Sequence, residues 1–222
     1  MTKNLIIALF TLISTISSAQ NKNALKFLGI PIDGSEAQLI AQLKSKGFEK
    51  EYQMDDYVTG MFNGEEVSIF LSTNHGLVDR VKVVYPYCSE RNDVRVKYNL
   101  LLSRFNRNAK YVCVNPRTEV PATEDIYQQL RNNTKYYDAV YFSLAPEINA
   151  EQWVEEFKQE YLGNYNRTLE GLSYEEMEEA LFCLPGKIAD AVNGVVWFTI
   201  VENHYININY VNLSNRPRGE DL

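Results

Sequence analysis

The sequence contains little histidine and little cysteine, and this scarcity removes several kinds of active site. Among 222 residues there are two histidines, His75 and His204, and three cysteines. No H-E-x-x-H, C-x-x-C, G-x-S-x-G or G-x-x-x-x-G-K motif occurs, so zinc, thiol-redox, serine-hydrolase and phosphate-loop chemistry lose their usual signatures. Each histidine lies at or beside an expected hairpin turn, where a solvated turn residue is the simpler interpretation. We therefore expect no catalytic residue, no metal site and no cofactor.

Positive charge is also in short supply. The chain has 22 Lys and Arg residues against 29 Asp and Glu residues, which gives a formal net charge of −7. A negatively charged surface repels phosphates and anionic lipids, and no run of basic residues offsets this repulsion. We therefore expect neither nucleic acid nor a membrane surface as a partner.

Long apolar runs are missing everywhere except at the N-terminus. There Lys3 precedes the apolar run Leu5–Ile13, and small residues follow up to Ala19. This order is typical of a signal peptide cleaved before Gln20, and the apolar run is about half of the ~20 residues that span a membrane. Residues 1–19 are thus predicted to be a signal peptide, and the mature chain to be periplasmic or extracellular with no membrane insertion.

The three cysteines are Cys88, Cys113 and Cys183, so at most one disulfide can form within the chain. Cys183 lies among apolar neighbours, which is typical of a buried thiol. Cys88 and Cys113 are the candidate disulfide pair in an oxidising compartment. A bridge and two inert thiols both fit these two positions.

Several helices are predicted from their first and last residues. Ser35 and Gln38 have the spacing of a capping box, and Gly47 is a suitable left-handed stop. Asn149 and Gln152 repeat the capping pattern before a second helix. The remaining helices are expected after Ser89, between Ala122 and Arg131, and after Ser173, and their apolar residues recur at helical spacing.

Strands are predicted where the hydrophobic period changes to two. Alternation runs from Tyr57 to Tyr85, with Asn63-Gly64 as a hairpin turn, and returns in Val195–Val201 and Tyr205–Val211. The fold class expected from these patterns is α+β: an antiparallel meander plus a C-terminal hairpin with one wet face, and helices packed on one side. We expect one domain over 20–222, with a regular part at 25–112, an irregular, insertion-like region at 113–193 and a closing hairpin at 194–222.

Aromatic residues are abundant, with 15 tyrosines. Tyr136, Tyr137 and Tyr141 in one expected strand do not all fit one buried face, so some of these rings are expected to face solvent. Exposed tyrosines on a sheet favour contact with a protein or a sugar. The candidate binding residues are Tyr137, Tyr141, Tyr205 and Asn207.

Several segments resemble a family of small secreted proteins of unknown function common in Gram-negative gut anaerobes. The resemblance lies in Phe27–Ser35, the following Leu39, Leu43 and Lys46–Phe48, and in Gly60–Gly64, Val81–Val83, Tyr205–Tyr210 and Asn215. A helix followed by a meander is also similar to the fold of β-lactamase inhibitor proteins and of small outer-membrane assembly lipoproteins. That similarity implies contact with another protein through a sheet, and it implies no catalytic residue.

Three hypotheses follow from the sequence. The first is a non-catalytic protein, secreted or periplasmic, that binds another macromolecule, such as an envelope or secreted protein, through its sheet. The second is a binding module for a carbohydrate or other small molecule, with Asn207 and Asn209 in a concave aromatic site. The third is a hydrolase that uses two carboxylates, with these candidates: Asp55-Asp56, Glu65-Glu66, Glu155-Glu156, Glu175, Glu176, Glu178 and Glu179.

Overall fold

The fold is known from a computed structural model, which describes residues 24–50, 57–86, 91–114, 116–165, 186–202 and 205–215, together with Glu176 and Glu179. Its centre is a seven-stranded sheet in which every neighbouring pair is antiparallel. The strands are β3 (Glu49–Lys50), β4 (Tyr57–Phe62), β5 (Glu65–Asn74), β6 (Leu77–Val84), β7 (Ala139–Leu144), β8 (Val192–Val201) and β9 (Tyr205–Asn212).

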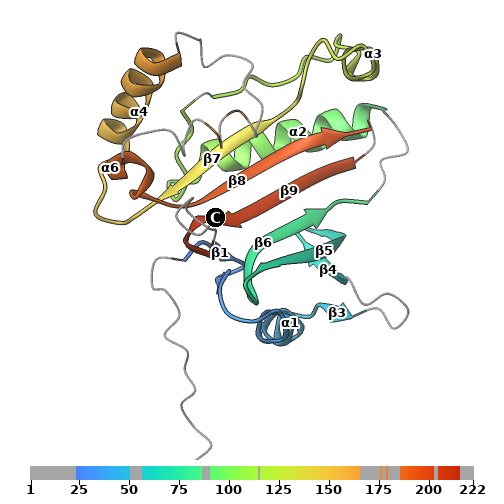
Figure 1. The fold of residues 1–222 in the computed structure, drawn as a ribbon. Helices are drawn as coiled ribbons and strands as arrows, with labels where there is room; N and C mark the ends of the chain where they lie inside the picture. The colour runs from blue at the N-terminus through green and yellow to red at the C-terminus, as the bar shows by residue number, and fades with distance from the viewer. Residues whose placement is uncertain are drawn as a thin grey trace, which may run out of the picture.

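The spatial order of the strands is β3-β4-β5-β6-β9-β8-β7 (Figure 1). The C-terminal hairpin β8–β9 therefore lies inside the sheet, between the meander and β7. A separate two-stranded hairpin, β1 (Lys26–Phe27) and β2 (Ile30–Pro31), precedes the sheet. The other elements are the helices α1 (Glu36–Ser45), α2 (Arg91–Asn106), α3 (Ile126–Arg131), α4 (Ala150–Tyr165) and α6 (Gly186–Ala189) and the 3₁₀ turn η2 (Leu213–Asn215).

Local sequence signals explain the first helix and the hairpin turns. The main-chain N–H of Gln38 donates to Oγ of Ser35, and Oε1 of Gln38 accepts from the N–H of Ser35, so the capping box is confirmed. Asn63 and Gly64 have φ values of 54° and 90°, which are the positive values that a type I′ turn requires. The expected Asn63-Gly64 hairpin is likewise confirmed, with Phe62 opposite Glu65.

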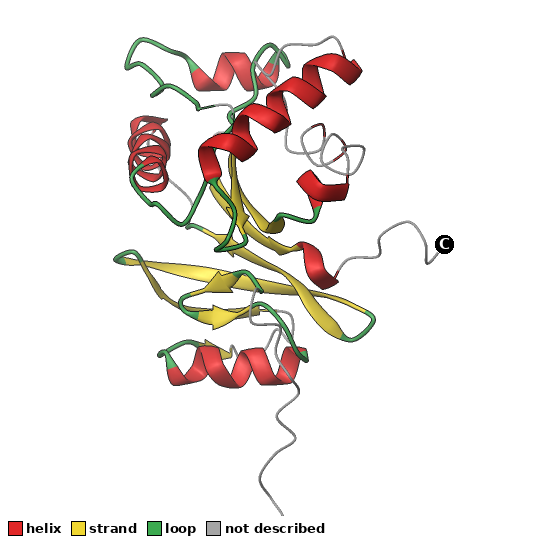
Figure 2. Cartoon of the chain, turned by 90° about the vertical axis from the view of Figure 1, so that its left-hand side faces the viewer, coloured by secondary structure: helices red, strands yellow, loops and turns green. Residues whose placement is uncertain are grey.

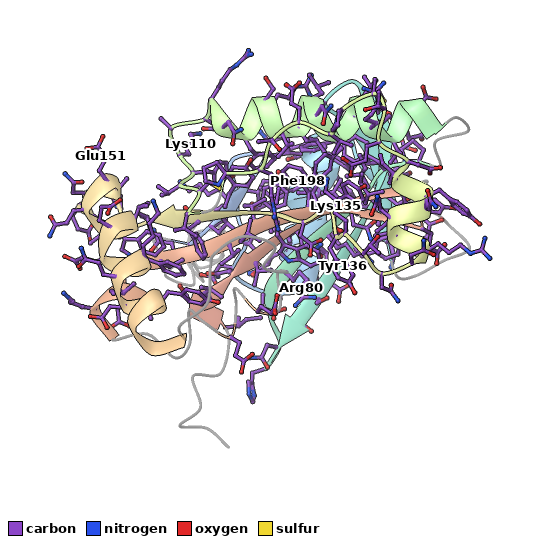
Figure 3. All side chains as sticks on the ribbon, turned by 90° about the horizontal axis from the view of Figure 1, so that it is seen from above. Arg80, Lys110, Lys135, Tyr136, Glu151 and Phe198 are labelled. Atoms are coloured by element: carbon purple, nitrogen blue, oxygen red, sulfur yellow. The ribbon has the colours of Figure 1, made fainter. Side chains whose placement is uncertain are left out.

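One face of the sheet, which we call the α2 face, is covered by α1 and α2. Val83, Ile208 and Phe198 lie side by side on this face, and all three are buried in one cluster with the apolar residues of both helices. Phe198 lies between the sheet and α2 (Figure 3), with its ring 5.4 Å from that of Tyr98. The predicted stripe of α2 residues is confirmed by the burial of Val94, Tyr98, Leu101 and Phe105.

The opposite face, which we call the α4 face, is covered at its β7–β8 end by α4 and α6. Phe142, Val195 and Val211 form a second cluster there with Trp153, Phe157 and Ile188. Figure 2 shows α2 on one side of β7–β9, and α4 and α6 on the other. The expected α+β class with an antiparallel sheet is confirmed, but the expectation that helices pack on one side is wrong.

The reason for helices on both faces is the composition of the strands at this end. Val195 and Val196 are both buried, as are Val140 and Tyr141, so consecutive residues that point to opposite faces are apolar. A strand of this kind needs cover on both sides. The region 113–193 supplies part of that cover and also supplies the edge strand β7. That the chain is a single domain stays a prediction, although one sheet joins strands from both ends of the described chain.

Candidate functional site

Two of the four candidate binding residues lie in the core. The side chains of Tyr137 and Tyr141 are 2% and 1% exposed on the α2 face. The ring of Tyr141 stacks on that of Phe198 at 5.9 Å, and its hydroxyl donates a 2.8 Å hydrogen bond to Oδ1 of Asn106. Their interpretation as surface binding residues is wrong, because both rings face α2. Tyr136 is the exposed member of this group, at 55%.

The other two candidates lie on β9 and are half-buried. Tyr205 pairs with Val201, and Asn207 lies between Thr199 and Val84 on the α4 face. Oδ1 of Asn207 is buried and has no hydrogen-bond partner among the described residues. Asn209, two residues further along this face, is only 2% exposed. The expectation of one wet face on the closing hairpin is therefore wrong at Asn209.

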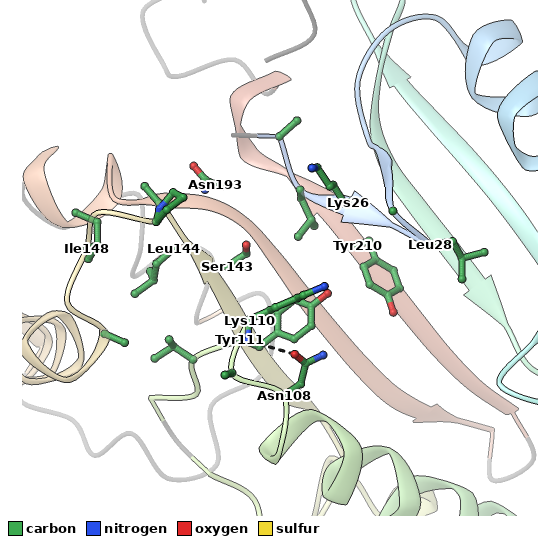
Figure 4. Close-up of a pocket in the computed structure, with 18 residues that line it drawn as sticks. Lys26, Leu28, Asn108, Lys110, Tyr111, Ser143, Leu144, Ile148, Asn193 and Tyr210 are labelled. Atoms are coloured by element: carbon green, nitrogen blue, oxygen red, sulfur yellow. Dashed lines mark hydrogen bonds between the residues drawn. The ribbon is translucent and has the colours of Figure 1, made fainter. Parts of the chain in front are cut away.

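A cavity of about 650 Å³ lies elsewhere, where four segments of the chain meet. One wall is the β1–β2 hairpin with Lys26, and a second is the loop after α2 with Lys110 and Tyr111. The third wall is the connection from β7 to α4, and the fourth consists of Asn193 and Tyr210 on the sheet (Figure 4). Neither Asn207 nor Asn209 is part of its lining, so the concave site expected at these two residues is not the one formed here.

Main-chain hydrogen bonds hold the walls of the cavity in place. Val112 and Phe142 exchange two such bonds, of 2.8 and 2.7 Å, which fix the loop after α2 against β7. In the same loop the N–H of Tyr111 donates to the carbonyl oxygen of Asn108 at 3.0 Å. Leu28 and Gly29 both have positive φ, 52° and 81°, and so form the tight turn of the β1–β2 hairpin. The cavity is therefore formed by ordered backbone before any ligand enters.

The chemical character of the cavity is cationic and polar. Lys26 and Lys110 are both exposed at its edge, and the described lining contains no Asp or Glu. Amide and hydroxyl groups are contributed by Asn108, Ser143 and Asn193, and Leu144 is among the apolar part of the wall. Two ammonium groups at a cavity whose described lining has no carboxylate attract an anion.

Two tyrosines of the lining remain neutral at physiological pH. Burial raises the pKa of Tyr111 above the ordinary value for a phenol. Burial raises the pKa of Tyr210 further, and the nearby hydroxyls of Tyr111 and Tyr85 act in the same direction. Both hydroxyl groups can therefore donate hydrogen bonds as well as accept them.

The candidate carboxylate pairs do not form a cleft where the structure describes them. On α4, Glu155 forms an i,i+3 ion pair with Lys158, and Glu156 pairs with Lys187 of α6. Glu65 pairs with Lys97 of α2. Asp55-Asp56, Glu175 and Glu178 lie outside the described residues. Over the described ranges, no three His, Cys, Asp or Glu side chains gather closely enough to hold a metal ion.

The remaining expectations concern cysteine, histidine and the membrane. Cys113 is half-buried against the core of the α2 face, whereas Cys88 and Cys183 lie outside the described residues, so the Cys88–Cys113 disulfide stays a prediction. His75 occupies a hairpin turn with φ of 48°, and His204 is not described. In the described part of the chain, no helix has the length and apolar character to cross a bilayer.

The residues of the cavity carry no motif that the sequence analysis could have found. Lys26 and Lys110 come from distant segments, and each is an ordinary surface residue in its local sequence. The only local signal is the pair of left-handed residues at Leu28-Gly29. The tertiary fold brings both lysines to the lining of one cavity.

Comparison of the chain with protein-family models, with curated proteins and with solved structures gives no significant match. The resemblance to a family of small secreted proteins and the similarity to the β-lactamase inhibitor fold therefore stay predictions.

Proposed function

We propose that this protein binds a small anionic molecule in the cavity between the β1–β2 hairpin and the loop after α2, without transforming it. The observation that carries the proposal is the presence of two lysines, Lys26 and Lys110, at one preformed cavity whose described lining has no carboxylate. The chain as a whole has a net charge of −7, so a local group of cations opposes the average charge of the protein. Such a group is a means of selecting an anion.

The polar groups of the wall support a small, hydroxylated ligand. Asn108, Ser143 and Asn193 offer amide and hydroxyl groups, and Tyr111 adds a neutral phenol beside them. A few polar groups in a partly apolar hollow of this size are typical of small-molecule sites. A sugar acid such as galacturonate has the matching chemistry, since it combines one carboxylate with several hydroxyl groups.

Isothermal titration with galacturonate and with galactose tests the proposal, because the two sugars differ in the carboxylate. We expect galacturonate to bind at least about tenfold more tightly than galactose, as two charge-assisted hydrogen bonds would give. Lys26→Gln combined with Lys110→Gln should remove this preference. Lys44→Gln, at an exposed position on α1 away from the cavity, is the matched control. Equal binding of both sugars, or a double variant that binds galacturonate as wild type does, would refute the proposal.

We also propose, from the sequence, that the mature protein begins at Gln20 and is periplasmic or extracellular. The support is the order of charge, apolar run and small residues in 1–19. N-terminal sequencing of the protein from envelope and culture fractions tests this proposal, with Ala19→Arg as the variant that should block cleavage. A cytoplasmic protein that still carries Lys3 would contradict it.

Binding of another macromolecule through the sheet remains the second candidate function. The observation in its favour is on the α4 face, where Asn207 has a buried carbonyl oxygen without a partner among the described residues and Tyr205 is half-buried beside it. A pull-down from envelope and culture fractions, with Tyr205→Ala and Asn207→Ala as paired variants, tests this function. A partner retained by both variants would exclude these two residues from its binding surface.

A further inference from the structure

The cavity adjoins a second hollow on the α2 face. This second hollow has a volume of about 180 Å³ and lies between the β4–β5 turn, at Asn63, and the C-terminal part of α2, at Arg104. Asn108, Tyr111 and Tyr210 line both spaces. The three shared residues place the two hollows side by side, and we call the two together the groove.

A third cation borders the far part of this groove. Arg104 is exposed on α2, and it forms no ion pair with any residue in the described ranges. Glu65, which lines a small neighbouring hollow together with Arg104, is paired with Lys97. The groove is therefore lined by Lys26 and Lys110 in the first hollow and by Arg104 in the second, and the guanidinium group of Arg104 forms no ion pair with the described residues.

The middle of the groove is aromatic. The rings of Phe105 and Tyr111 lie 5.2 Å apart, and both line the second hollow with Phe62 and Tyr210. Phe62, Phe105 and Tyr210 are almost fully buried, whereas Tyr111 is half-buried and borders both hollows. Tyr111 is thus placed to contact a ligand that extends from one hollow into the other.

We infer that the groove takes an elongated ligand with at least two anionic groups, of the class of acidic oligosaccharides. One carboxylate would lie at Lys26 and Lys110, and another at Arg104. A sugar ring between them would lie against Tyr111, since aromatic rings pack on the apolar faces of sugars. This inference rests on the proposed function and extends it from one anionic group to two.

The test compares galacturonate with trigalacturonate by isothermal titration. When two binding groups are joined in one ligand, the second contact becomes intramolecular. We therefore expect the trimer to bind at least about tenfold more tightly than the monomer. Arg104→Gln should remove most of this gain and leave the affinity for the monomer within about twofold. Arg131→Gln, at an exposed position on α3, is the matched control, and circular dichroism checks that each variant is folded.

The outcomes separate the two proposals. In one outcome the monomer binds through Lys26 and Lys110, but the trimer binds no more tightly than the monomer. In another, the tighter binding of the trimer persists in Arg104→Gln. In either case the proposed function stands and the inference of an elongated ligand is refuted. If the trimer binds and both Arg104→Gln and the double lysine variant weaken it, the inference is supported. Binding of triglutamate equal to that of trigalacturonate would contradict the oligosaccharide class, and no binding of either sugar at millimolar concentration would overturn both proposals.

Discussion

The side-chain amide of Asn212 donates a 2.7 Å hydrogen bond to the main-chain carbonyl oxygen of Ile32, and both residues are 0% exposed. Oδ1 of the same amide accepts from the main-chain N–H of Ser214 at 3.2 Å. The bond joins the end of β9 to the segment that follows β2. It therefore ties the hairpin that forms one wall of the cavity to the central sheet.

Asn212→Leu should destabilise the protein, because the buried carbonyl oxygen of Ile32 would lose its donor. We expect the free energy of unfolding in urea to fall by about 1–3 kcal/mol. Ser214→Ala is the matched control, because the bond at this position comes from the main chain and surface substitutions change stability by about 0.5 kcal/mol at most. A stability of Asn212→Leu equal to that of wild type would show that this bond contributes nothing.

Gly60 is the position in the meander where a side chain cannot fit. A Cβ atom at this position on β4 would overlap Cδ1 of Phe48, whose ring is buried. Gly60→Ala should therefore cost about 1–3 kcal/mol of unfolding free energy, the usual range for an overpacked core. Equilibrium unfolding in urea measures this loss.

Gly163→Ala is the control for the same substitution in open space. Gly163 lies in α4, and apart from its chain neighbours and the backbone of its own helix no heavy atom lies within 4 Å of a Cβ built there. Alanine has a higher helix propensity than glycine, so this variant should gain up to about 1 kcal/mol. If both alanines have the same effect, the close approach of Phe48 is not what constrains Gly60.

Short-range signals allowed much of the fold to be predicted. The start of α1 depends on Ser35 and Gln38, three residues apart, and the β4–β5 turn depends on Asn63-Gly64 alone. The buried stripe of α2 follows from spacing within one helix. These elements are correct in the sequence analysis because each signal and its structure occupy the same few residues.

Long-range packing could not be predicted in the same way. The position of β9 between β6 and β8 depends on pairing between residues such as Val83 and Ile208, which no local pattern specifies. The burial of Tyr137 and Tyr141 depends on α2, which covers them from another part of the chain. The cavity could not be predicted for the same reason, since Lys26 and Lys110 come to line one cavity only in the folded protein.

The carboxylate of Glu124 should make stability depend on acidic pH. Partial burial acts to raise the pKa of this group, but hydrogen bonds from Lys135, at 2.6 Å, and from the hydroxyl of Tyr137, together with the charge of Lys135, hold the pKa below its usual value. A carboxyl group whose pKa is lower in the folded state stabilises the protein above its unfolded pKa of about 4.3. That stability is lost as the pH falls through the folded pKa.

Glu124→Gln should therefore make the free energy of unfolding depend less steeply on pH in the acidic range, which we call the acid limb of the stability curve. Urea unfolding at a series of pH values from about 6 down to 3 measures the slope of the unfolding free energy against pH, which is proportional to the difference in bound protons between the two states. Lys135→Gln should flatten the same limb, because it removes the main partner of the carboxylate. An acid limb as steep in Glu124→Gln as in wild type would show that other groups cause it.

Six tyrosines should ionise late when the folded protein is titrated with base. Burial raises the pKa of Tyr85, Tyr98, Tyr111, Tyr137, Tyr141 and Tyr210 above the ordinary value of 10.0. A phenol whose pKa is raised in the folded state stabilises the protein fully below the unfolded pKa of about 10. Its contribution is lost as the pH rises, because the unfolded chain then releases the proton first.

Absorbance of the phenolate near 295 nm follows this ionisation. At about pH 11, roughly one unit above the ordinary value for a phenol, we expect at least four of the 15 tyrosines to be still protonated while the protein is folded, namely Tyr98, Tyr137, Tyr141 and Tyr210, whose pKa burial raises furthest. In guanidinium all 15 should ionise together near the ordinary value, because burial is lost on unfolding. Tyr141→Phe should lower the late amplitude by one tyrosine, since it removes one of these four phenols. A folded protein that ionises all its tyrosines in one step near pH 10 would contradict the buried positions of these rings, and with them the covered α2 face from which the groove is formed.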